Sequence, residues 1–343
     1  MPTAPHGNMY YISTENCKNP DQRPHARGLC RKKKTTMQKT LQLYTLALAS
    51  FLTIIFFASY YSNTETPEKP LASQPNSGKL PQMIRPVSLD KPFDFANEKL
   101  PMDNFDVRER LDRELLVNTY LHATTLLHIK NTYKYFPLIE KILSANGLPD
   151  DFKYLAVAES SLRNAVSPAG ARGIWQFMKN TGEYYGLEIN EEVDERYHIE
   201  KATEAACKYL SDYKKQFGNW TLAAAAYNMG GPRLKKEMQL QRADNYYDLN
   251  LNDETSRYVF RVVAIKEVLQ NPDAFGFYLE PNEGYPPLSD YKTVEVKDAI
   301  ENLGDFALQH GTTYRMLKVY NPWLISSKLS NKTRKTYEIK IPS

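Results

Sequence analysis

The stretch of sequence that decides the fold is PDDFKYLAVAESSLRNAVSPAGARGIWQFM, residues 149–178. A helix over the first part of this stretch places Leu155 and Ala156 on one apolar stripe, and Glu159 is the next position on that stripe. Pro168 and a glycine two residues later end the helical pattern. The sequence therefore predicts a short, largely buried helix with a carboxylic acid at its C-terminal end.

The position of Glu159 predicts a carboxyl group with a raised pKa. Burial disfavours the ionised form, and the negative end of the helix dipole disfavours it further. No Lys or Arg lies one turn before Glu159 to offset these two effects. A carboxylic acid that is still protonated near neutral pH can act as a general acid toward a glycosidic oxygen. From the pattern alone, a glutamate at the edge of the stripe that reaches water is an equally good interpretation.

Helical patterns recur on both sides of this stretch, and little between residues 104 and 280 alternates like a strand. A helix is expected from about Asn104 or Asp106, either of which can cap it, until Pro137 interrupts it. Further helices are expected at about residues 138–146, 174–185, 200–217, 221–229 and 254–270. The body of the protein is therefore predicted to be mainly α.

Two of these helices carry polar or aromatic residues that can line a cleft. NWTLAAAAYNMGG, residues 219–231, predicts a short helix with Tyr227 and Asn228 on its last turn. ETSRYVFRVVAIKEVL, residues 254–269, places Tyr258 near the start of another helix. Ordinary alanine-rich packing with an Asn-x-Gly stop explains the first pattern equally well, and a lone tyrosine on a striped helix is more often a core residue.

Four short motifs follow one another along this body: ES at residues 159–160, GIWQ at 173–176, AYN at 226–228 and ET-x-x-Y at 254–258. Their order and spacing resemble the four motifs of the lytic transglycosylases of glycoside hydrolase family 23, over about residues 104–280. The second motif departs from the GLMQ form of many relatives at its two central residues.

The resemblance implies a lysozyme-like α fold, a transglycosylase (SLT) domain over residues 104–282, and no cofactor. It implies cleavage of peptidoglycan glycan strands between N-acetylmuramic acid and N-acetylglucosamine, with formation of a 1,6-anhydro sugar. Glu159 matches the single catalytic acid and base. Five further residues match cleft positions that bind or orient the sugar: Ser167, Gln176, Tyr227, Asn228 and Tyr258.

Two other classes of protein stay open. A hydrolase of the goose-lysozyme type would share Glu159 and the fold but add water, and hydrolysing glycosidases normally use two carboxyl groups. The candidates for a second carboxyl group lie in one polar stretch that is expected to be loop-like and solvated: Glu183, Glu188, Glu191, Glu192, Asp194 and Glu195. A non-catalytic peptidoglycan-binding scaffold would keep only the shape, which the presence of Glu159, Tyr227 and Asn228 disfavours.

Residues 285–343 predict a separate α+β module. YKTVEV from Tyr291 and TYEIKIP near residue 340 alternate like strands, and two short helices divided by Gly311 lie between them. This βααβ order resembles a LysM domain, a binder of glycans that contain N-acetylglucosamine. The usual G-D-T-L after the first strand is replaced by AIENLGDFA, so a docking domain without affinity for glycan is the alternative.

Charge and hydropathy set the N-terminal residues apart. Residues 1–40 carry eight basic and two acidic side chains, so the rest of the chain, whose total is +4, sums to −2. No charged residue occurs between Thr40 and Thr64, and LQLYTLALASFLTIIFFASYY within that window is long enough to cross a bilayer. The basic residues before it predict a cytoplasmic tail over residues 1–40 and a body outside the cytoplasm, in the periplasm of the cell envelope.

The segment at residues 41–62 is expected to be a retained transmembrane anchor, because no good signal-peptidase site follows its apolar core. A cleaved signal segment and a start at Met37 stay open. Seven prolines predict an extended linker over residues 63–103. The near-neutral body argues against nucleic-acid binding, and no Cys/His cluster has the spacing of a metal site. The oligomeric state is not indicated.

Overall fold

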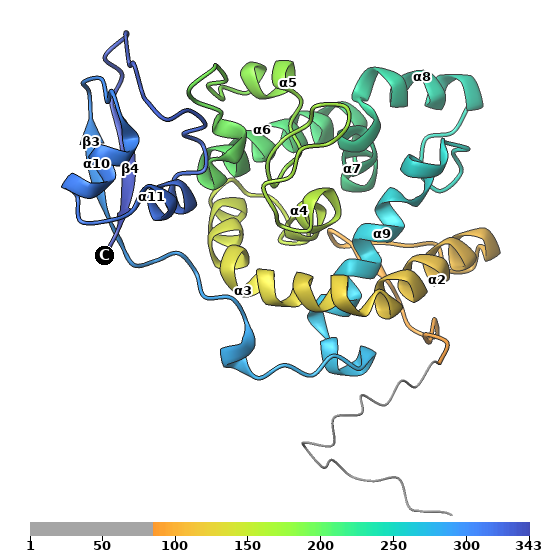
Figure 1. The fold of residues 1–343 in the computed structure, drawn as a ribbon. Coiled ribbons are helices and arrows are strands. Elements are labelled where there is room, and N and C mark those ends of the chain that lie inside the picture. Colours follow the sequence, from red (N-terminus) through yellow and green to blue (C-terminus); the bar gives the residue numbers. More distant parts are fainter. Residues whose placement is uncertain (1–84) are drawn as a thin grey trace, which may run out of the picture. The chain divides into compact units, whose positions relative to one another are not determined.

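The structure, a computed structural model, describes residues 85–343 (Figure 1). The predicted cytoplasmic tail and membrane anchor, residues 1–40 and 41–62, lie outside the described residues. From residue 85 onward, none of the helices combines the length and the apolar character needed to cross a membrane. The described residues form a helical body and a C-terminal module.

The helical body is built from a small hairpin, β1 and β2, and from helices α2 to α9. Their bounds are β1 Asp94–Phe95, β2 Glu98–Lys99, α2 Phe105–Tyr120, α3 His122–Ala145, α4 Phe152–Ser160, α5 Lys179–Tyr184, α6 Ile199–Phe217, α7 Trp220–Met229, α8 Gly231–Gln241 and α9 Asp253–Gln270. Short 3-10 helices lie at Glu195–Tyr197, Pro272–Phe275 and Pro281–Glu283. The prediction of a mainly α body is confirmed.

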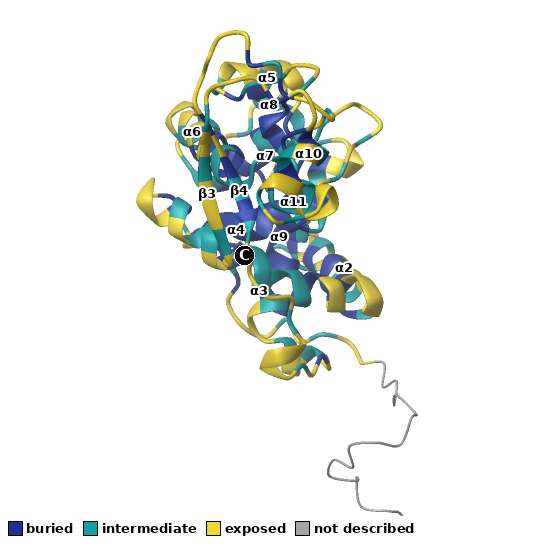
Figure 2. Ribbon diagram, turned by 60° about the vertical axis from the view of Figure 1, so that its left-hand side comes forward, coloured by how far each residue is buried: buried dark blue, intermediate teal, exposed yellow. Residues whose placement is uncertain are grey.

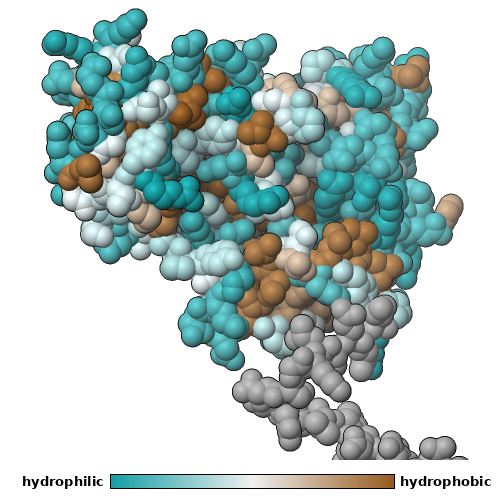
Figure 3. All heavy atoms as spheres, in the orientation of Figure 1, coloured by the Kyte–Doolittle hydropathy of each residue, from teal (hydrophilic) through white to brown (hydrophobic). Residues whose placement is uncertain are grey.

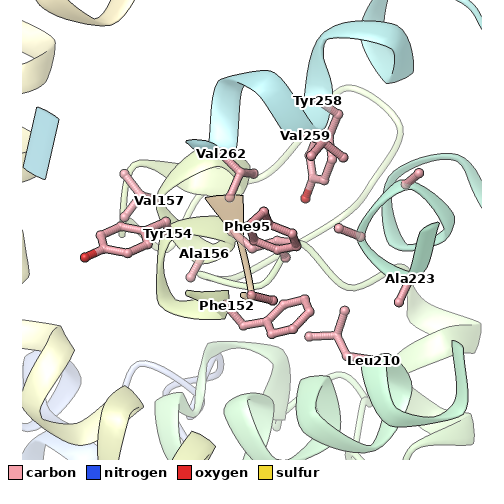
Figure 4. Close-up of a cluster of buried hydrophobic side chains, with 14 of the residues drawn as sticks. Phe95, Phe152, Tyr154, Ala156, Val157, Leu210, Ala223, Tyr258, Val259 and Val262 are labelled. Atoms are coloured by element: carbon pink, nitrogen blue, oxygen red, sulfur yellow. The ribbon is translucent and has the colours of Figure 1, made fainter. Parts of the chain in front are cut away.

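Helix α4 lies in the buried centre of this body (Figure 2). Seven of its nine residues are buried, and it packs against α3 and α9. Phe152 meets the rings of Phe95 and Trp220 edge-on, with centroids 5.3 and 5.1 Å apart. Figure 4 shows Phe95 and Phe152 among the buried apolar side chains. The face drawn in Figure 3 is mostly hydrophilic, with apolar side chains in separate patches. The apolar stripe predicted for α4 is therefore part of the core.

The predicted linker over residues 63–103 ends earlier than expected. Phe95 is fully buried, and β1 pairs with β2. The Glu98 carboxylate accepts hydrogen bonds from the backbone N–H groups of Trp220 and Thr221 at 2.6 and 2.8 Å. It therefore satisfies unpaired donors at the N-terminus of α7, where the helix dipole favours a negative charge. The hairpin belongs to the body and not to a spacer, because it fills the core and caps a helix.

A buried lysine ties the hairpin to the centre of the body. Lys266 of α9 is buried, and its Nζ donates to Asp94 Oδ1 at 2.9 Å and to Asp151 Oδ2 at 2.8 Å. Asp151 also accepts the N–H of Ala96 at 2.6 Å. Burial alone lowers the pKa of Lys266, but the two carboxylates outweigh burial and raise it above its ordinary value. The cation is thus held between β1 and the start of α4.

One predicted helix break is misplaced. Helix α3 continues through Pro137, which was expected to interrupt the helical pattern, and the break lies at Leu121 between α2 and α3. A proline inside a helix removes one hydrogen bond and bends the axis without necessarily ending it. Figure 1 shows α3 changing direction along its length. Helix α5 begins at Lys179, later than the expected residue 174.

The C-terminal module consists of β3 Tyr291–Val296, α10 Leu303–Gln309, α11 Tyr314–Tyr320 and β4 Tyr337–Pro342. The two strands are antiparallel, with Tyr291 opposite Pro342 and Val296 opposite Tyr337. Side chains from both strands and both helices form a core separate from that of the body. The predicted βααβ order is confirmed.

The module is joined to the body through residues 188–200, which run from the loop after α5 to the first turn of α6 and which we call the docking segment. Val193 of this segment is buried in the core of the module, and its backbone forms a β-bridge with Leu324. The Glu192 carboxylate accepts hydrogen bonds from the N–H and Oγ of Ser330 at 2.6 and 2.7 Å. The docking segment therefore contributes to both domains.

Ion pairs border this contact. Lys335 Nζ lies 2.5 Å from Glu188 and 3.4 Å from Glu195. Lys340 of β4 pairs with Glu200 at the start of α6. Each of these pairs joins a lysine of the module to a carboxylate of the docking segment, so complementary charge reinforces the apolar contact.

The expectation that the acidic stretch is solvated is therefore wrong for most of its carboxylates. Asp194 and Glu195 are 1% and 2% exposed, and others bind the module. Of the six carboxylates proposed as candidates, Glu183 and Glu191 are the exposed ones. A carboxylate whose partner is far away in sequence has the same local pattern as a solvated one, so sequence periodicity did not separate them.

Acidification should weaken the contact between the docking segment and the module. Burial raises the pKa of Glu200, but hydrogen bonds from His198 and Lys340 outweigh burial and hold it at about 2. Because the folded pKa lies below the unfolded value of 4.5, Glu200 stabilises the folded state above pH 4.5, and this is lost as the pH falls toward 2. We expect Glu200→Gln to cost about 1 kcal/mol in urea unfolding at pH 7.

The difference between Glu200→Gln and wild type should shrink between pH 4.5 and pH 2. Glu191→Gln, which changes an exposed carboxylate of the same segment, should not alter the free energy of unfolding at either end of this range. An equal loss for Glu200→Gln at all pH values would contradict the assignment.

Candidate active site

Glu159 lies in the last turn of α4, and an unusual turn follows it. Ser161 and Leu162 adopt left-handed backbone conformations, with φ of 57° and 55°. Such conformations are costly for residues other than glycine and persist where the surrounding structure enforces them. Leu162 is fully buried, and Asn131 of α3 donates to the Ser161 carbonyl at 3.3 Å. These contacts fix the end of α4 and with it the position of the Glu159 carboxyl group.

Tyr258 of α9 is the direct partner of this carboxyl group. Its hydroxyl donates a hydrogen bond to Glu159 Oε1, and its ring is buried beside α4. Asn252 caps α9 by accepting the N–H of Thr255 at 3.0 Å, which sets where the helix begins and therefore where Tyr258 lies. The structure thus brings together two residues that are 99 positions apart.

Burial raises the pKa of Glu159 to about 7. The hydrogen bond from Tyr258 lowers it, the negative charge of Glu254 raises it, and the positive charge of Arg261 lowers it, each by less than burial does. The direction of the shift is the one expected from the apolar stripe. Near neutral pH the group is present in both its protonated and its ionised form.

Glu254 was not recognised from the sequence as a charged neighbour of Glu159. Arg261 donates to both carboxylate oxygens of Glu254, at 3.0 and 3.3 Å. Such a bidentate pair holds a carboxylate in a fixed orientation. Arg261 also lies 3.8 Å from Glu114, a buried carboxylate of α2. Glu254 and Arg261 are two helical turns apart, so their shared helix face was a signal that could have revealed the pair.

Tyr227 and Asn228 lie on the last turn of α7, as predicted. The Tyr227 hydroxyl donates to the Trp175 carbonyl at 2.6 Å, and Asn228 Oδ1 accepts the hydroxyl of Thr255 at 2.8 Å. Within residues 85–343 the Asn228 amide N–H groups have no partner. Burial raises the pKa of Tyr227 well above 10, and the nearby charge of Glu159 raises it further. Tyr227 therefore stays neutral.

Gln176 holds a turn of the loop between α4 and α5. Its own φ is 50°, and its Nε2 donates to the carbonyls of Gly173 and Ala165 at 2.8 and 3.2 Å. A Cβ atom on Gly173 would lie 1.9 Å from the carbonyl oxygen of Arg196. Glycine is therefore required where the loop meets the docking segment. The predicted helix over residues 174–185 starts late because this turn occupies its first residues.

Ser167 lies on the same loop. Its Oγ accepts the N–H of Ala171 at 3.0 Å, which closes a short turn. Among residues 85–343 no hydrogen bond joins Ser167 to Glu159. The structure therefore connects Glu159, Tyr258 and Tyr227 through a hydrogen bond and through nearby charge, whereas Gln176 and Ser167 hold turns of the loop after α4.

The docking segment forms hydrogen bonds to the backbone of this loop. Arg196 is 4% exposed and donates to the carbonyls of Gly170 and Phe177 at 3.3 and 3.2 Å. Asp194 accepts from Arg196 Nε and from its terminal nitrogen at 2.8 and 2.7 Å. The backbone N–H of Asp194 donates to the carbonyl of Trp323 in the module at 2.9 Å. One buried ion pair therefore links the Gln176 loop to the C-terminal module.

Comparison with protein families assigns both domains. Residues 137–250 match the family model of the transglycosylase SLT domain, a range that contains Glu159, Gln176 and Tyr227. Residues 292–343 match that of the soluble lytic transglycosylase C-terminal LysM-like domain. The two matches follow one another along the chain, the SLT model first and the LysM-like model second.

Among curated proteins the chain is similar to membrane-bound lytic murein transglycosylase D of Escherichia coli strain K12, with 29% identity over 244 residues. The protein of the same name from E. coli O6:H1 matches to the same extent. The similarity covers 68% of this chain and 52% of the relative, so the chain spans about half the length of the curated relatives it matches.

Two solved structures are also similar over part of the chain. The 70 kDa soluble lytic transglycosylase of E. coli shows 21% identity and a TM-score of 0.37, over 52% of this chain and 31% of that one. An inactive mutant of lytic transglycosylase Slt from Pseudomonas aeruginosa shows 24% identity and a TM-score of 0.34, over 43% and 26%.

Replacing Glu159 by glutamine should stabilise the protein at neutral pH. A carboxyl group whose pKa rises from 4.5 to about 7 on folding destabilises the folded state progressively between these pH values, and fully above pH 7. Glutamine carries no such penalty. We expect Glu159→Gln to gain about 1–3 kcal/mol over wild type as the pH rises from 4.5 to 7, with no further gain above.

Chemical denaturation across this pH range measures the difference. Glu183→Gln alters an exposed carboxylate and should follow wild type throughout. A constant difference between Glu159→Gln and wild type at all pH values would show that the pKa of Glu159 is not raised on folding.

Proposed function

We propose that this protein is a lytic transglycosylase that cleaves the β-1,4 bond between N-acetylmuramic acid and N-acetylglucosamine in peptidoglycan. Its product would carry a 1,6-anhydromuramic acid end, formed in turnover or remodelling of the cell wall. The observation that carries the proposal is one carboxyl group, Glu159, whose pKa of about 7 suits it to both give and accept a proton. The SLT domain around it supports the same reaction class.

The first step breaks the glycosidic bond. Protonated Glu159 donates its proton to the oxygen that leaves with N-acetylglucosamine, while the bond from that oxygen to C1 of the muramic acid breaks. Tyr258 donates its hydrogen bond to Oε1, so Oε2 is the oxygen left to carry the transferred proton. The same hydrogen bond stabilises the carboxylate that remains after the transfer.

The second step closes the sugar on itself. The oxygen of the C6 hydroxyl of the same muramic acid bonds to C1. As this bond forms, ionised Glu159 accepts the proton of that hydroxyl. The carboxyl group is then protonated again, and no water is consumed. The two products together have the mass of the substrate. A second catalytic carboxyl group is not needed, because Glu159 serves in both steps.

Three residues of the candidate site have free hydrogen-bonding capacity that a sugar could use. Asn228 has its amide N–H groups, Gln176 its Oε1 and Ser167 its hydroxyl proton, since the protein uses their other polar atoms. We assign these residues to substrate binding. The Tyr227 hydroxyl is already used by the Trp175 carbonyl, so Tyr227 would contribute its ring, and Tyr258 orients Glu159.

A hydrolase would require a second carboxyl group at about 5–5.5 or 6.5–9.5 Å from the first. Four of the six carboxylates named from the sequence are bound in the docking segment, and the other two, Glu183 and Glu191, are exposed. Glu254 is the carboxylate whose charge acts on Glu159, and Arg261 holds it in a bidentate pair. Its engagement with Arg261 favours the transglycosylase over the hydrolase.

The chemistry is tested with two matched glutamine variants and purified peptidoglycan. Glu159→Gln should lower turnover by more than the roughly 10²–10⁴-fold that is typical of one proton-transfer role, because the group acts twice. Glu254→Gln should keep measurable turnover. Its removal of a negative charge lowers the pKa of Glu159, so the alkaline limb of activity should move to lower pH.

Mass spectrometry of the released sugars separates the two reaction classes. The wild-type product should be one water lighter than a lysozyme product. A reducing-end muramic acid as the main product, or a loss in Glu254→Gln as large as that in Glu159→Gln, would favour a two-carboxylate hydrolase. A non-catalytic scaffold would release no sugar at all.

We further propose that the LysM-like module contributes to glycan binding and that residues 41–62 anchor the protein in a membrane, with its body outside the cytoplasm. The domain match supports the first assignment, and the membrane-bound relative supports the second. The full chain should remain in the membrane fraction after a high-salt wash.

Phe51→Arg with Ile55→Arg should release the protein, because each arginine near the middle of a spanning helix costs about 2.5–3.5 kcal/mol. Fractionation followed by immunoblotting gives the readout, and Gln42→Ala is the control inside the same segment. A soluble mature form that begins after about residue 60 would establish a cleaved signal segment instead.

A further inference from the structure

A cavity of about 310 Å³ lies where the C-terminal module meets the helical body. Its lining comes from α3, from the loop after α4 and from the docking segment on one side, and from β3, α11 and β4 on the other. Neither domain encloses it alone. Its size is at the lower end of the range for ligand sites in proteins, enough for one sugar ring.

Aromatic side chains from both domains form its walls: Tyr135, Tyr197, Tyr291, Tyr320 and Trp323. The rings of Tyr291 and Tyr320 are 6.0 Å apart and nearly perpendicular, so they present two differently oriented faces. Aromatic rings with polar tips suit a pyranose, whose C–H faces pack on rings while its hydroxyl groups meet the tips.

Several polar groups around the cavity lack partners. Within residues 85–343, no hydrogen bond is made by the side chains of Lys134, Tyr135, Asn164 or Tyr320, of which Asn164 is exposed and the other three are half-buried. Burial lowers the pKa of Lys134 and raises that of Tyr135, so both have lost water. A ligand rich in hydroxyl and amide groups would satisfy donors and acceptors that the protein leaves free.

Most of the charge in the lining is paired within the protein, which is compatible with a neutral ligand. Glu200 and Lys340, which both line the cavity, are paired with each other. Lys134 is then the lining cation without a carboxylate partner in the described part of the chain, and it lies over the ring of Tyr135. N-acetylhexosamines carry no charge and need no ion pair. A peptide with several carboxylates could pair only one of them here, with Lys134.

Two lining residues belong to loops of the active site. Asn164 is the fifth residue after Glu159, on the loop that carries Ser167. Ile174 precedes Trp175, whose carbonyl accepts the hydroxyl of Tyr227. The loop that follows the catalytic carboxyl group therefore also lines the cavity. One extended polymer that occupied both sites would contact this loop twice.

We propose that this interdomain cavity binds a further N-acetylhexosamine unit of the glycan strand, held jointly by the helical body and the module. This inference rests on the proposed function, because it names a second site for the same class of substrate. It differs from glycan binding by the module alone, since Tyr135 and Asn164 belong to the other domain.

The test measures binding of β-1,4-linked N-acetylglucosamine hexamer to the full chain in detergent, by isothermal titration calorimetry. All variants are made in the inactive Glu159→Gln background, so that the ligand stays intact. Tyr320→Ala should weaken binding about tenfold, and Tyr135→Phe, which removes one unpaired hydroxyl, about fivefold. Tyr314→Ala is the matched control, because this exposed tyrosine lies on the same helix outside the cavity.

The outcomes separate this proposal from the proposed function. Equal hexamer binding by Tyr320→Ala and Tyr314→Ala would overturn the cavity site even if the anhydro product forms. Weakening by Tyr320→Ala but not by Tyr135→Phe would place the sugar on the module alone and would also overturn it. Weakening by both variants supports the cavity site even if the wild type yields a hydrolysis product. Thermal unfolding of each variant shows that the fold is intact.

Discussion

The burial of α4 is the constraint on which the rest of the structure depends. A helix of nine residues is not stable by itself in water, so it forms only because other elements cover it. Helices α3 and α9 pack against it, and the β1–β2 hairpin places Phe95 against Phe152 at its first turn. At its C-terminal turn Glu159 is half-buried, and Tyr258 is the partner of its carboxyl group.

This arrangement explains why one group can have an unusual pKa without unfolding the site. The apolar surroundings that stabilise α4 are the same surroundings that disfavour a charge on Glu159. Tyr258 limits the penalty by donating a hydrogen bond, and Arg261 limits it through its charge. The stability of the core and the reactivity of the carboxyl group therefore have a common physical origin.

Local patterns in the sequence predicted what depends on local geometry. The apolar stripe placed Glu159 at the end of a buried helix, and Tyr227 and Asn228 were placed on a last turn, as observed. The strand alternation around Tyr291 was also sufficient to define the module. In each case the residues that form the pattern lie within a few turns or one strand, where periodicity is a direct consequence of backbone geometry.

Interactions between distant positions were not predictable in this way. Glu98 was assigned to a linker although it caps α7, more than a hundred positions later. Glu188 and Glu195 were taken as solvated although Lys335 lies between them. Pro137 was given too much weight, because a bend is compatible with a continuous helix. A single sequence does not show which partner a charged side chain will meet, and the docking segment consists largely of such side chains.

The docking segment also has a consequence for the order in which the protein is assembled. Glu192 and Glu188 find their partners 138 and 147 positions later in the chain. During synthesis the helical body therefore emerges with these carboxylates still facing water and with Val193 uncovered. Arg196 and Asp194 are two positions apart and can pair as soon as both are made. The hydrogen bond from the Asp194 N–H to the Trp323 carbonyl forms only later. The loop that carries Gln176 thus gains this support only once the module has been made, after the helices that carry Glu159 and Tyr258.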